Sequence, residues 1–554
     1  MKTTRPISKL LALVLCLSMI SALLISHVSA TEPEGTPIYD EAGLKAIADN
    51  LSGDYYLANN IKLTENWSPI DNFTGTLDGD GHSIYNMNIV GSNTSEDYFG
   101  LFGVVNGATI KNLTLYGTIN VTPVGSTWAL VGSFAGRSYD SVNNTNTATI
   151  QNCVSYVDIN VNGRAHVGGI IGQVIKAGLE IKNCANYGAV SLDSNAYVAY
   201  VGGIISQNNT GVLTVENCVN FGDVTMGENV SAGKAHTYLG GIFAWHAAGT
   251  TTLKSSVNFG SIESHSQRTG GVVGYIANNG TINIFNCANI GDLEIKWKGD
   301  PATLGAFMGG IVGHNEATNA AVTGCYNDAT ITHPYAAGTS NLYCGGIAAS
   351  EGKIAYTNCV TVGSLPVFGY GNHATSKEGC EVLTTESDLN DVLDKLNNNL
   401  EEGQEAFRLN NGAIEPLYYL TKSDMTVIGY QMKTDADNYS VRFVSAVSSL
   451  GFDQVGYRIT VTGTGVNKST DVASDIVYSA IYETKDGQPA QVDSPYGCYF
   501  YTATIEGISV ENYDELTFVV TPYVIPEGGT VEDAELGSPA TFVFKDGVLV
   551  DCQK

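Results

Sequence analysis

Three neighbouring side chains near the start of the chain have the types needed for acid–base chemistry. Asp78, Asp80 and His82 lie in the segment LDGDGH at 77–82. Cleavage of a glycosidic bond uses two carboxyl groups at a set separation, so this cluster predicts a polysaccharide lyase or hydrolase if it is catalytic. Acids interleaved with glycine are also typical of a tight turn between strands, and we favour that interpretation.

Aromatic side chains recur two residues before a repeated pair of glycines. The position holds Tyr200, Tyr238, Phe307 and Tyr343, with His166 and Arg268 in two other copies. If successive copies stack, these residues form a column, and sugar rings pack their apolar faces on aromatic surfaces. The four aromatic residues, with Trp297 in a variable loop, are the candidate ligand contacts. Packing of these side chains under the loops or into the core is the alternative, and we favour it.

Other chemistry is weakly represented. The nine histidines lack metal-ligand spacing, no CxxC occurs, and no Ser/His/Asp order or GxSxG segment stands out. The sequence therefore predicts no metal site and no cofactor. It leaves open whether the protein is an enzyme, and we expect that it is not.

One eleven-residue phrase, repeated eight times, must position all of these side chains. The copies are TIKNLTLYGTI at 109–119, TIQNCVSYVDI at 149–159, EIKNCANYGAV at 180–190, TVENCVNFGDV at 214–224, TLKSSVNFGSI at 252–262, NIFNCANIGDL at 283–293, AVTGCYNDATI at 321–331 and AYTNCVTVGSL at 355–365. A regular period of this size indicates a solenoid, in which each copy buries its apolar face against its neighbours.

Each copy holds three strand-sized pieces, which match one coil of a parallel β-helix. They are a glycine-led apolar block such as GGIIG, the Ile-x-Asn-Cys segment and a short Gly-x-Val strand. The Asn position also accepts Ser255 and Gly324, which predicts a left-handed turn with side-chain amides stacked along the axis. The gap before the next glycine pair varies, so insertions should emerge at one corner, the expected binding edge.

The Cys position of the repeat predicts a ladder of free, buried thiols. It is occupied by Cys153, Cys184, Cys218, Cys287, Cys325 and Cys359, and by Leu113 and Ser256 in the other two copies. A slot that accepts Cys, Leu or Ser is a small buried space, not an obligate disulfide. Cys344, Cys380, Cys498 and Cys552 lie outside this pattern.

The segments around the repeats predict caps and a second domain. Leu44, Ile47, Ala48 and Leu51 have helical spacing, as do the leucines of 389–400, and these two helices should close the ends of the solenoid. From about 424, short period-two strands indicate a β-sandwich of immunoglobulin-like character. We divide the chain into a signal peptide (1–30), an N-terminal cap with the first strands (31–90), the β-helix (91–380), a C-terminal cap helix with a closing strand (381–423) and the sandwich (424–554).

The N-terminal segment and the net charge limit where the protein is located and which partners it can bind. Lys2, Arg5 and Lys9, the apolar run 10–24 and Val28-Ser29-Ala30 form a secretory signal, so we expect an extracellular protein, secreted or attached to the cell surface. The formal net charge is −28 at pH 7. Nucleic acid is excluded as a partner because phosphate binding needs clustered Lys and Arg, and no segment predicts membrane insertion.

The repeat, roughly Gly-Gly-Ile-x-Gly…Ile-x-Asn-Cys-x-Asn-x-Gly-x-Val, resembles the GLUG motif of bacterial secreted and surface proteins. The resemblance covers about 37–365 and implies a right-handed parallel β-helix, as found beside M26-type metallopeptidases. It implies no activity, because the HExxH of those peptidases is absent. Residues 424–549 are similar to β-sandwich modules of secreted gut-Firmicute proteins, some of them carbohydrate-active.

The sequence thus predicts an all-β protein: a right-handed parallel β-helix with helical caps, then an immunoglobulin-like sandwich. The favoured function is non-catalytic binding or adhesion, with a polysaccharide or host glycoprotein as partner. A polysaccharide lyase or glycoside hydrolase on the same scaffold is one alternative. A structural spacer or surface-layer component is the other.

Overall fold

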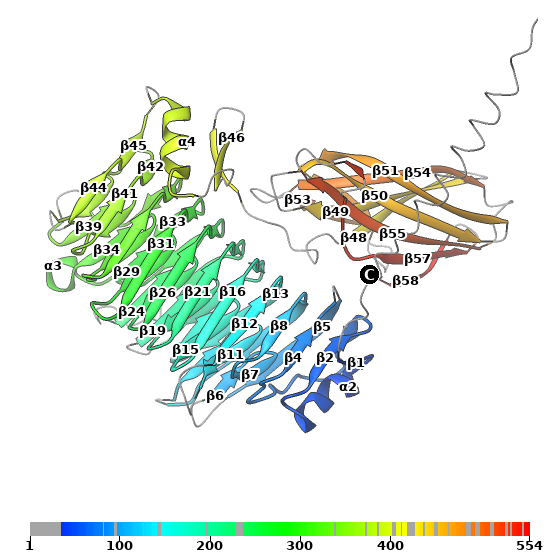
Figure 1. The fold of residues 1–554 in the computed structure, drawn as a ribbon, viewed down its shortest axis with the longest axis horizontal. Helices are drawn as coiled ribbons and strands as arrows, with labels where there is room; N and C mark the ends of the chain where they lie inside the picture. The colour runs from blue at the N-terminus through cyan, green and yellow to red at the C-terminus, as the bar shows by residue number, and fades with distance from the viewer. Residues whose placement is uncertain are drawn as a thin grey trace, which may run out of the picture.

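The computed structural model describes residues 35–553 with short gaps, and the predicted signal peptide lies outside this range. The residues not described within it are 81, 93–96, 126, 141–145, 194–197, 228–235, 337–338, 372–373, 385–386, 401–405, 411–412, 418–426, 436–437, 448–451, 464, 478, 484–488, 494–498, 510–514, 527–529, 532–533 and 546–547. In the described part, four parallel sheets wind into about eight stacked turns, which confirms the predicted β-solenoid (Figure 1).

Sheet A carries the strands before the Asn-Cys position. Its twelve strands are β1 (Thr36–Ile38), β2 (Asp54–Leu57), β4 (Thr76–Asp78), β8 (Thr109–Lys111), β12 (Thr147–Gln151), β16 (Gly178–Lys182), β21 (Val212–Glu216), β26 (Thr250–Lys254), β31 (Thr281–Phe285), β36 (Ala320–Thr323), β41 (Ala355–Thr357) and β44 (Ser376–Glu378).

Sheet B follows the Asn-Cys turn and divides into two halves after its early turns. The undivided strands are β3 (Ile61–Lys62), β5 (Ser83–Gly91), β9 (Thr114–Val121) and β13 (Val154–Asn162). The first half continues through β17 (Ala185–Asn186), β22 (Val219–Asn220), β27 (Val257–Asn258), β32 (Ala288–Asn289), β37 (Tyr326–Asn327), β42 (Val360–Val362) and β45 (Glu381–Leu383). The second half comprises β18 (Val190–Asp193), β23 (Val224–Met226), β28 (Ile262–Ser264), β33 (Leu293–Ile295) and β38 (Ile331–Thr332).

Sheets D and C lie before and after each glycine pair. Sheet D contains β6 (Asp97–Phe99), β10 (Ala129–Val131), β14 (Ala165–Gly168), β19 (Val198–Gly202), β24 (His236–Gly240), β29 (Arg268–Gly270), β34 (Ala306–Gly309) and β39 (Leu342–Gly345). Sheet C contains β7 (Phe102–Val105), β11 (Ala135–Tyr139), β15 (Ile171–Ile175), β20 (Ile205–Asn208), β25 (Phe243–His246), β30 (Val273–Ile276), β35 (Val312–Asn315), β40 (Ala348–Ser350) and β43 (Phe368–Tyr370). The glycine pair is therefore a corner between two strands, and the prediction of three strands per turn missed the strand that precedes it.

The repeated asparagines occupy the left-handed turns that the sequence predicts. Asn112, Asn152, Asn183 and Asn217 have φ of 53–54°, and Ser255 and Gly324 follow the same pattern at 47° and 62°. Their amides form a chain along the axis, with Nδ2 of Asn152, Asn183 and Asn217 donating to the preceding Asn Oδ1 at 3.0, 3.1 and 3.3 Å. Asn112 begins the chain by donating to Asp78 at 2.9 Å.

A second amide ladder runs inside the solenoid. Asn186, Asn220, Asn258 and Asn289 are fully buried, and each Nδ2 donates to the Oδ1 of the next turn at 2.8–3.0 Å, ending on Asn327. The second glycine of each pair provides the room. A Cβ on Gly203 would lie 2.4 Å from the Asn220 Cγ, and the other turns are equally tight. The double glycine is thus a steric requirement of this ladder.

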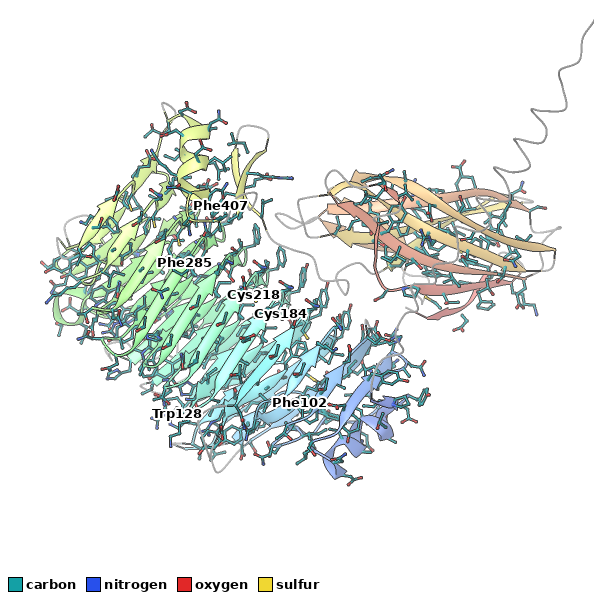
Figure 2. All side chains as sticks on the ribbon, in the orientation of Figure 1. Phe102, Trp128, Cys184, Cys218, Phe285 and Phe407 are labelled. Atoms are coloured by element: carbon teal, nitrogen blue, oxygen red, sulfur yellow. The ribbon has the colours of Figure 1, made fainter. Side chains whose placement is uncertain are left out.

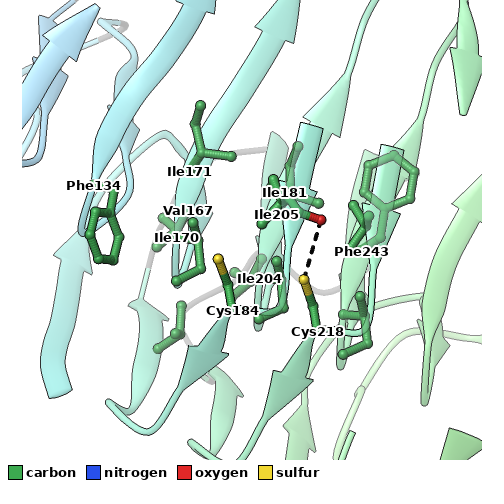
Figure 3. Close-up of a cluster of buried hydrophobic side chains, with 14 of the residues drawn as sticks. Phe134, Val167, Ile170, Ile171, Ile181, Cys184, Ile204, Ile205, Cys218 and Phe243 are labelled. Atoms are coloured by element: carbon green, nitrogen blue, oxygen red, sulfur yellow. Dashed lines mark hydrogen bonds between the residues drawn. The ribbon is translucent and has the colours of Figure 1, made fainter. Parts of the chain in front are cut away.

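The predicted thiol ladder is confirmed in the core. All six predicted cysteines are free and buried among Ile and Val side chains, and Cys218 Sγ lies 3.4 Å from the Ile181 carbonyl oxygen (Figure 3). Cys380, which the sequence did not align, continues the ladder because its neighbour Glu381 pairs with Val360, the neighbour of Cys359 in the preceding turn. Burial raises the pKa of Cys287 to about 12, so this thiol is not nucleophilic at neutral pH.

Short helices lie near both ends of the solenoid. Asp40 caps α2 (Glu41–Lys45), which continues as a 3-10 turn (Ala46–Asp49) and buries Leu44 and Ile47 in the main core. A third helix, α3 (Pro301–Leu304), lies in an insertion. Asp388 caps α4 (Leu389–Asn397), whose Val392 and Leu396 pack with the hairpin β46 (Phe407–Asn410) and β47 (Ala413–Pro416) on outward residues of β27, β32, β37 and β42. The contacts of α4 lie on the side of sheet B, so closure of the last turn by this helix stays a prediction.

The C-terminal region is antiparallel and has its own core. Its strands are β48 (Val427–Asp435), β49 (Asn438–Val447), β50 (Phe452–Gly463), β51 (Val466–Val477), β52 (Ser479–Glu483), β53 (Pro489–Asp493), β54 (Tyr499–Ser509), β55 (Glu515–Pro526), β56 (Glu535–Leu536), β57 (Ala540–Lys545) and β58 (Val548–Gln553). Strand β51 pairs with both β50 and β54 and joins the two halves of this sheet around Tyr457, Tyr501 and Phe542.

Candidate functional site

The aromatic column of the sequence lies at the corner between sheets D and C. Its members are in register on successive turns in the order Tyr98, Leu130, His166, Tyr200, Tyr238, Arg268, Phe307 and Tyr343. Sheet C adds Trp245, Tyr275 and His314 from the other side of the corner. We call this set the D–C corner. Like residues therefore stack over like, as the repeat requires.

The rings of the D–C corner stack mainly on one another. Tyr200 lies 5.1 Å from Tyr238 and 4.7 Å from Trp245 between ring centroids, and Phe307 lies 3.8 Å from the His314 ring at an interplanar angle of 6°. A sugar needs an open ring face for stacking. Because neighbouring turns occupy these faces, the column offers ring edges and polar tips to a ligand.

Burial differs along the column. Tyr200 and Tyr238 are only 4% and 3% exposed, whereas Phe307 and Tyr343 are half-buried. Beyond Tyr343, Tyr370 is 50% exposed and stacks on it at 4.4 Å. The last turns are therefore the part of the predicted column that solvent reaches.

Positive charge collects at this corner. Arg137, Arg164 and Arg268 are the only arginines between residues 31 and 380, and all three lie over aromatic rings there. The Arg164 guanidinium is 3.9 Å from the Trp128 ring centroid, and Trp128 lies at the margin of the solenoid away from Phe407 (Figure 2). Weak hydration lets guanidinium groups pack on rings in this way.

The buried histidines of the corner are neutral at pH 7. Burial, with the charges of Arg164 and Arg137, lowers the pKa of His166 to about 3. Burial and the charge of Arg268 lower the pKa of His314 to about 3, and Arg268 Nε donates to His314 Nδ1 at 2.6 Å. The corner is thus a packed, hydrogen-bonded cluster with cations at its surface.

Trp297 does not belong to an exposed loop surface. It is 1% exposed, lies in the main core, and the Tyr335 hydroxyl donates to its carbonyl oxygen at 2.6 Å. A Cβ on Gly299 would lie 2.1 Å from the Trp297 ring, so the chain folds tightly over the indole. The insertion therefore buries its own aromatic residue, and the predicted ligand contact of Trp297 stays a prediction.

The acid cluster forms a turn. Asp78 Oδ1 accepts from the Asp80 N–H and from Asn112 Nδ2, both at 2.9 Å, while Oδ2 pairs with Lys111 Nζ at 3.0 Å. Asp80 itself has a positive φ of 48°. Both oxygens of Asp78 therefore hold the turn and the start of the amide chain, which agrees with the favoured interpretation.

A different surface was missed by the sequence analysis: the outer face of sheet B. Its first row is a half-buried stack of six rings, Tyr85, Tyr116, Tyr156, Tyr187, Phe221 and Phe259. Neighbouring centroids are 4.6–5.2 Å apart and the planes differ by at most 15°. The signal was present in the repeated phrase, which carries Tyr or Phe at its eighth residue in five copies.

The second row of this face alternates between acceptors and small residues. In register it reads Asn88, Thr118, Asp158, Ala189, Asp223, Ser261, Asp292 and Thr330. Asp158, Asp223 and Asp292 each accept the backbone N–H of the next turn through Oδ1, at 2.9, 3.0 and 2.8 Å. Their Oδ2 atoms accept no hydrogen bond from the residues that the structure describes. We call this set the acceptor row.

The third row also faces solvent, with five of its eight residues exposed. It runs in register through Val90, Asn120, Asn160, Ser191, Thr225, Glu263, Glu294 and Thr332. Asn160 Nδ2 donates to Asn120 Oδ1 at 3.2 Å, and Lys296 Nζ bridges Glu263 and Glu294 at 3.0 Å each. We call this set the open row.

Three hollows follow the open row along the solenoid, and we call them together the groove. Of the acceptor row, Asp223, Ser261, Asp292 and Thr330 line one of these hollows, and Asp158 is exposed on the same face. One hollow of about 580 Å³ follows Asn120 and Asn160, and a second of about 410 Å³ follows the rows from Asp223 to Thr332. A third, of about 730 Å³, shares Glu263 and Glu294 with the second and reaches His333 in an insertion. The groove is lined by both polar and apolar atoms, and its hollows lie on several turns beside the predicted insertion corner.

Comparison with known proteins gives one partial similarity. A segment of 132 residues, 24% of this chain, is 34% identical to Halomucin of Haloquadratum walsbyi. The segment spans 1% of Halomucin. No family model matches the chain.

Among the residues with described positions, no group of three or more His, Cys, Asp or Glu side chains is arranged to hold a metal ion. Within the same part of the chain, none of the helices has both the length and the apolar character needed to cross a bilayer.

Proposed function

We propose that the protein is an extracellular bacterial repeat protein that binds a surface glycan or another cell-surface partner without catalysing a reaction. The observation that carries this proposal is the groove on the outer face of sheet B. Its acceptor row repeats a carboxylate on alternate turns, and its open row is polar from Asn120 to Thr332, which suits a repetitive ligand. The similarity of one segment to Halomucin supports a place at a cell surface.

Other parts of the chain fit this role as proposals of the same kind. The GLUG-like repeat and its right-handed winding suit an exported bacterial protein, with α2 and α4 protecting the ends of the solenoid. The C-terminal antiparallel domain would be an immunoglobulin-like sandwich that attaches or spaces the solenoid. Catalysis through Asp78 is not part of the proposal, because its hydrogen bonds serve the turn.

A glycan and mucin array probed with the purified chain tests the proposal. We expect retention on a subset of extended polysaccharides, with Kd values in the micromolar range or weaker, about −8 kcal/mol or less in magnitude, because a shallow groove gives few buried contacts. A parallel assay of reducing-end release should show no product. No retention on any glycan, mucin or intact cell surface at high protein concentration would refute the binding role.

A structural spacer is the second candidate, and the internal ladders favour it. Amide, thiol and aromatic side chains all bond or stack between turns, which suits a stiff rod. If the chain binds nothing on the array yet fractionates with the cell envelope, the spacer function replaces the binding function.

A further inference from the structure

The acceptor row has a period of two turns. Asp158, Asp223 and Asp292 stand on alternate turns, and the turns between them carry Ala189, Ser261 and Thr330 at this position. Adjacent turns are about 4.8 Å apart, so the carboxylates repeat at about 9.6 Å along the axis. A ligand lying in the groove therefore meets an identical charged acceptor at every second turn.

An extended polysaccharide with a twofold twist has the matching period. One pyranose in such a chain is about as long as one turn of the solenoid, and the same hydroxyl returns to the same side at every second sugar. Each returning hydroxyl can donate to the Oδ2 of Asp158, Asp223 or Asp292, because Oδ1 is already used by the backbone N–H. The Asn120 amide and the Ser191 and Thr332 hydroxyls lie on the turns between the acids and can bond the intervening sugars, while Asn160 adds an amide on the turn of Asp158.

The charge of the groove selects against acidic chains. Asp223, Glu263, Asp292 and Glu294 lie together in one hollow, and the whole chain carries a net charge of −28. Lys296 is engaged between Glu263 and Glu294, so it neutralises carboxylates of the groove itself. Uronic acids or sulfate groups would meet like charge, which raises the free energy of binding.

We propose that the groove on the outer face of sheet B binds an uncharged, extended polysaccharide with a disaccharide repeat, lying parallel to the solenoid axis at one sugar per turn. The proposal rests on the function given above and names its ligand class and subsites. The D–C corner has no part in it, because its rings pack against one another and against Arg268.

Four soluble oligosaccharides test the ligand class by calorimetry on the full chain. Cellohexaose and chitohexaose are uncharged and twofold, maltohexaose is uncharged but curved, and hexagalacturonate is extended but acidic. We expect one or both of the first pair to bind at least about tenfold more tightly than the other two. We also expect affinity to rise in steps of two sugars. Equal binding of maltohexaose or hexagalacturonate would overturn the proposal.

Two sets of variants test the location. Asp223→Asn with Asp292→Asn keeps an Oδ1 acceptor for the backbone N–H but removes the charged Oδ2, and Asn160→Ala removes an exposed amide. We expect each set to weaken binding about tenfold without changing the thermal midpoint. The matched control is Thr214→Ala with Thr252→Ala, whose side chains occupy one row on sheet A and should leave affinity unchanged.

The results of these experiments distinguish a failure of the binding function from a failure of the groove assignment. If array glycans bind equally to wild type and groove variants, the groove assignment is wrong while the binding function stands. If no glycan binds the wild type, both the function and the ligand class fail. Loss confined to the groove variants supports both.

Discussion

Asparagine can occupy the interior of this solenoid because each amide faces a glycine. Gly169, Gly203, Gly241, Gly271 and Gly310 would all place a Cβ within 2.7 Å of a ladder amide. In the turn where Ser133 replaces the glycine, Ser155 replaces the asparagine, and in the turn before it the two positions hold Leu101 and Leu115. The two positions compensate in size, as a close-packed interior requires. Asn186 Oδ1, at the start of the ladder, lacks a donor among the described residues.

This compensation predicts a strong coupling between two serines. Ser155→Asn alone should destabilise the protein by about 1–3 kcal/mol, because the amide meets the Ser133 side chain. Adding Ser133→Gly should recover that loss, and the new Nδ2 gives Asn186 Oδ1 a partner worth about 1 kcal/mol. Urea unfolding of both single variants and the double variant measures the coupling. Additive effects would show that the two positions do not share one space.

Some of these residue positions could be predicted from the sequence and others could not. The left-handed asparagines and the thiol slot were predictable, because Asn, Ser and Gly alternate at one position and Cys, Leu and Ser at another. The burial of Trp297 was not, because an insertion has no repeat to set its register. The acceptor row was also missed, since its acids read as ordinary exposed charges until register places Asp158, Asp223 and Asp292 on one face.

At the scale of elements, α4 completes the outer surface of sheet B. Phe259, Ile290 and Val362 lie at the edge of the cluster that buries Val392 and Leu396, so the helix covers the apolar continuation of the six-ring stack. Asn286 leaves the outer amide chain here and donates to the Leu396 carbonyl oxygen at 2.7 Å. Helical spacing predicted α4, but the face that it covers depends on contacts about 100 residues apart in sequence, which no local pattern contains.

Shortening the buried side chain of α4 should loosen the last turns selectively. Leu396 is fully buried, so Leu396→Ala should cost about 2–5 kcal/mol of local stability. Hydrogen exchange should become faster in β37 and β42, while β16 keeps its protection. Asp394→Ala, an exposed change on the same helix, serves as the control. Uniform acceleration through all turns would contradict local packing by α4.

A buried carboxylate paired with an exposed lysine holds the final strand of sheet A. The Glu351 side chain is fully buried, pairs with Lys377 and accepts the Ala374 N–H at 3.1 Å. Glu351→Ala removes this pair and the acceptor of the Ala374 N–H, while water can solvate the Lys377 ammonium, so we expect a loss of about 1–3 kcal/mol in the terminal turns. Limited proteolysis near 374–378 reads out the release of β44. Unchanged cleavage would show that the pair does not fasten this strand.

For the whole molecule, buried neutral histidines make the free energy of unfolding fall as the pH falls. His166, His246 and His314 are buried, and burial holds their pKa values at about 3, 4 and 3. The unfolded chain binds these protons near pH 6.5, whereas the native chain does not. Stability therefore rises with pH between about 4 and 6.5 and is lost as pH falls through that window.

Urea unfolding at several pH values measures this loss. Each histidine should contribute a slope of about 1.4 kcal/mol per pH unit below 6.5 and none above it. In His314→Gln the slope should fall by one such contribution, because glutamine offers Arg268 Nε an acceptor without binding a proton. A slope equal to that of the wild type would place the titration elsewhere.

The one-way direction of the interior amide ladder has a consequence for how the chain can change its length. Every ladder Nδ2 donates to the Oδ1 of the following turn. If one complete turn is removed, the Nδ2 before the deletion therefore meets the Oδ1 after it, and the ladder can re-form. Removal of residues 203–240 would join Gly202 to Gly241 and set Asn186 beside Asn258. Such a deletion should yield a shorter solenoid of the same cross-section. Natural variants can therefore gain or lose whole turns, which changes the length of the solenoid and leaves its cross-section fixed.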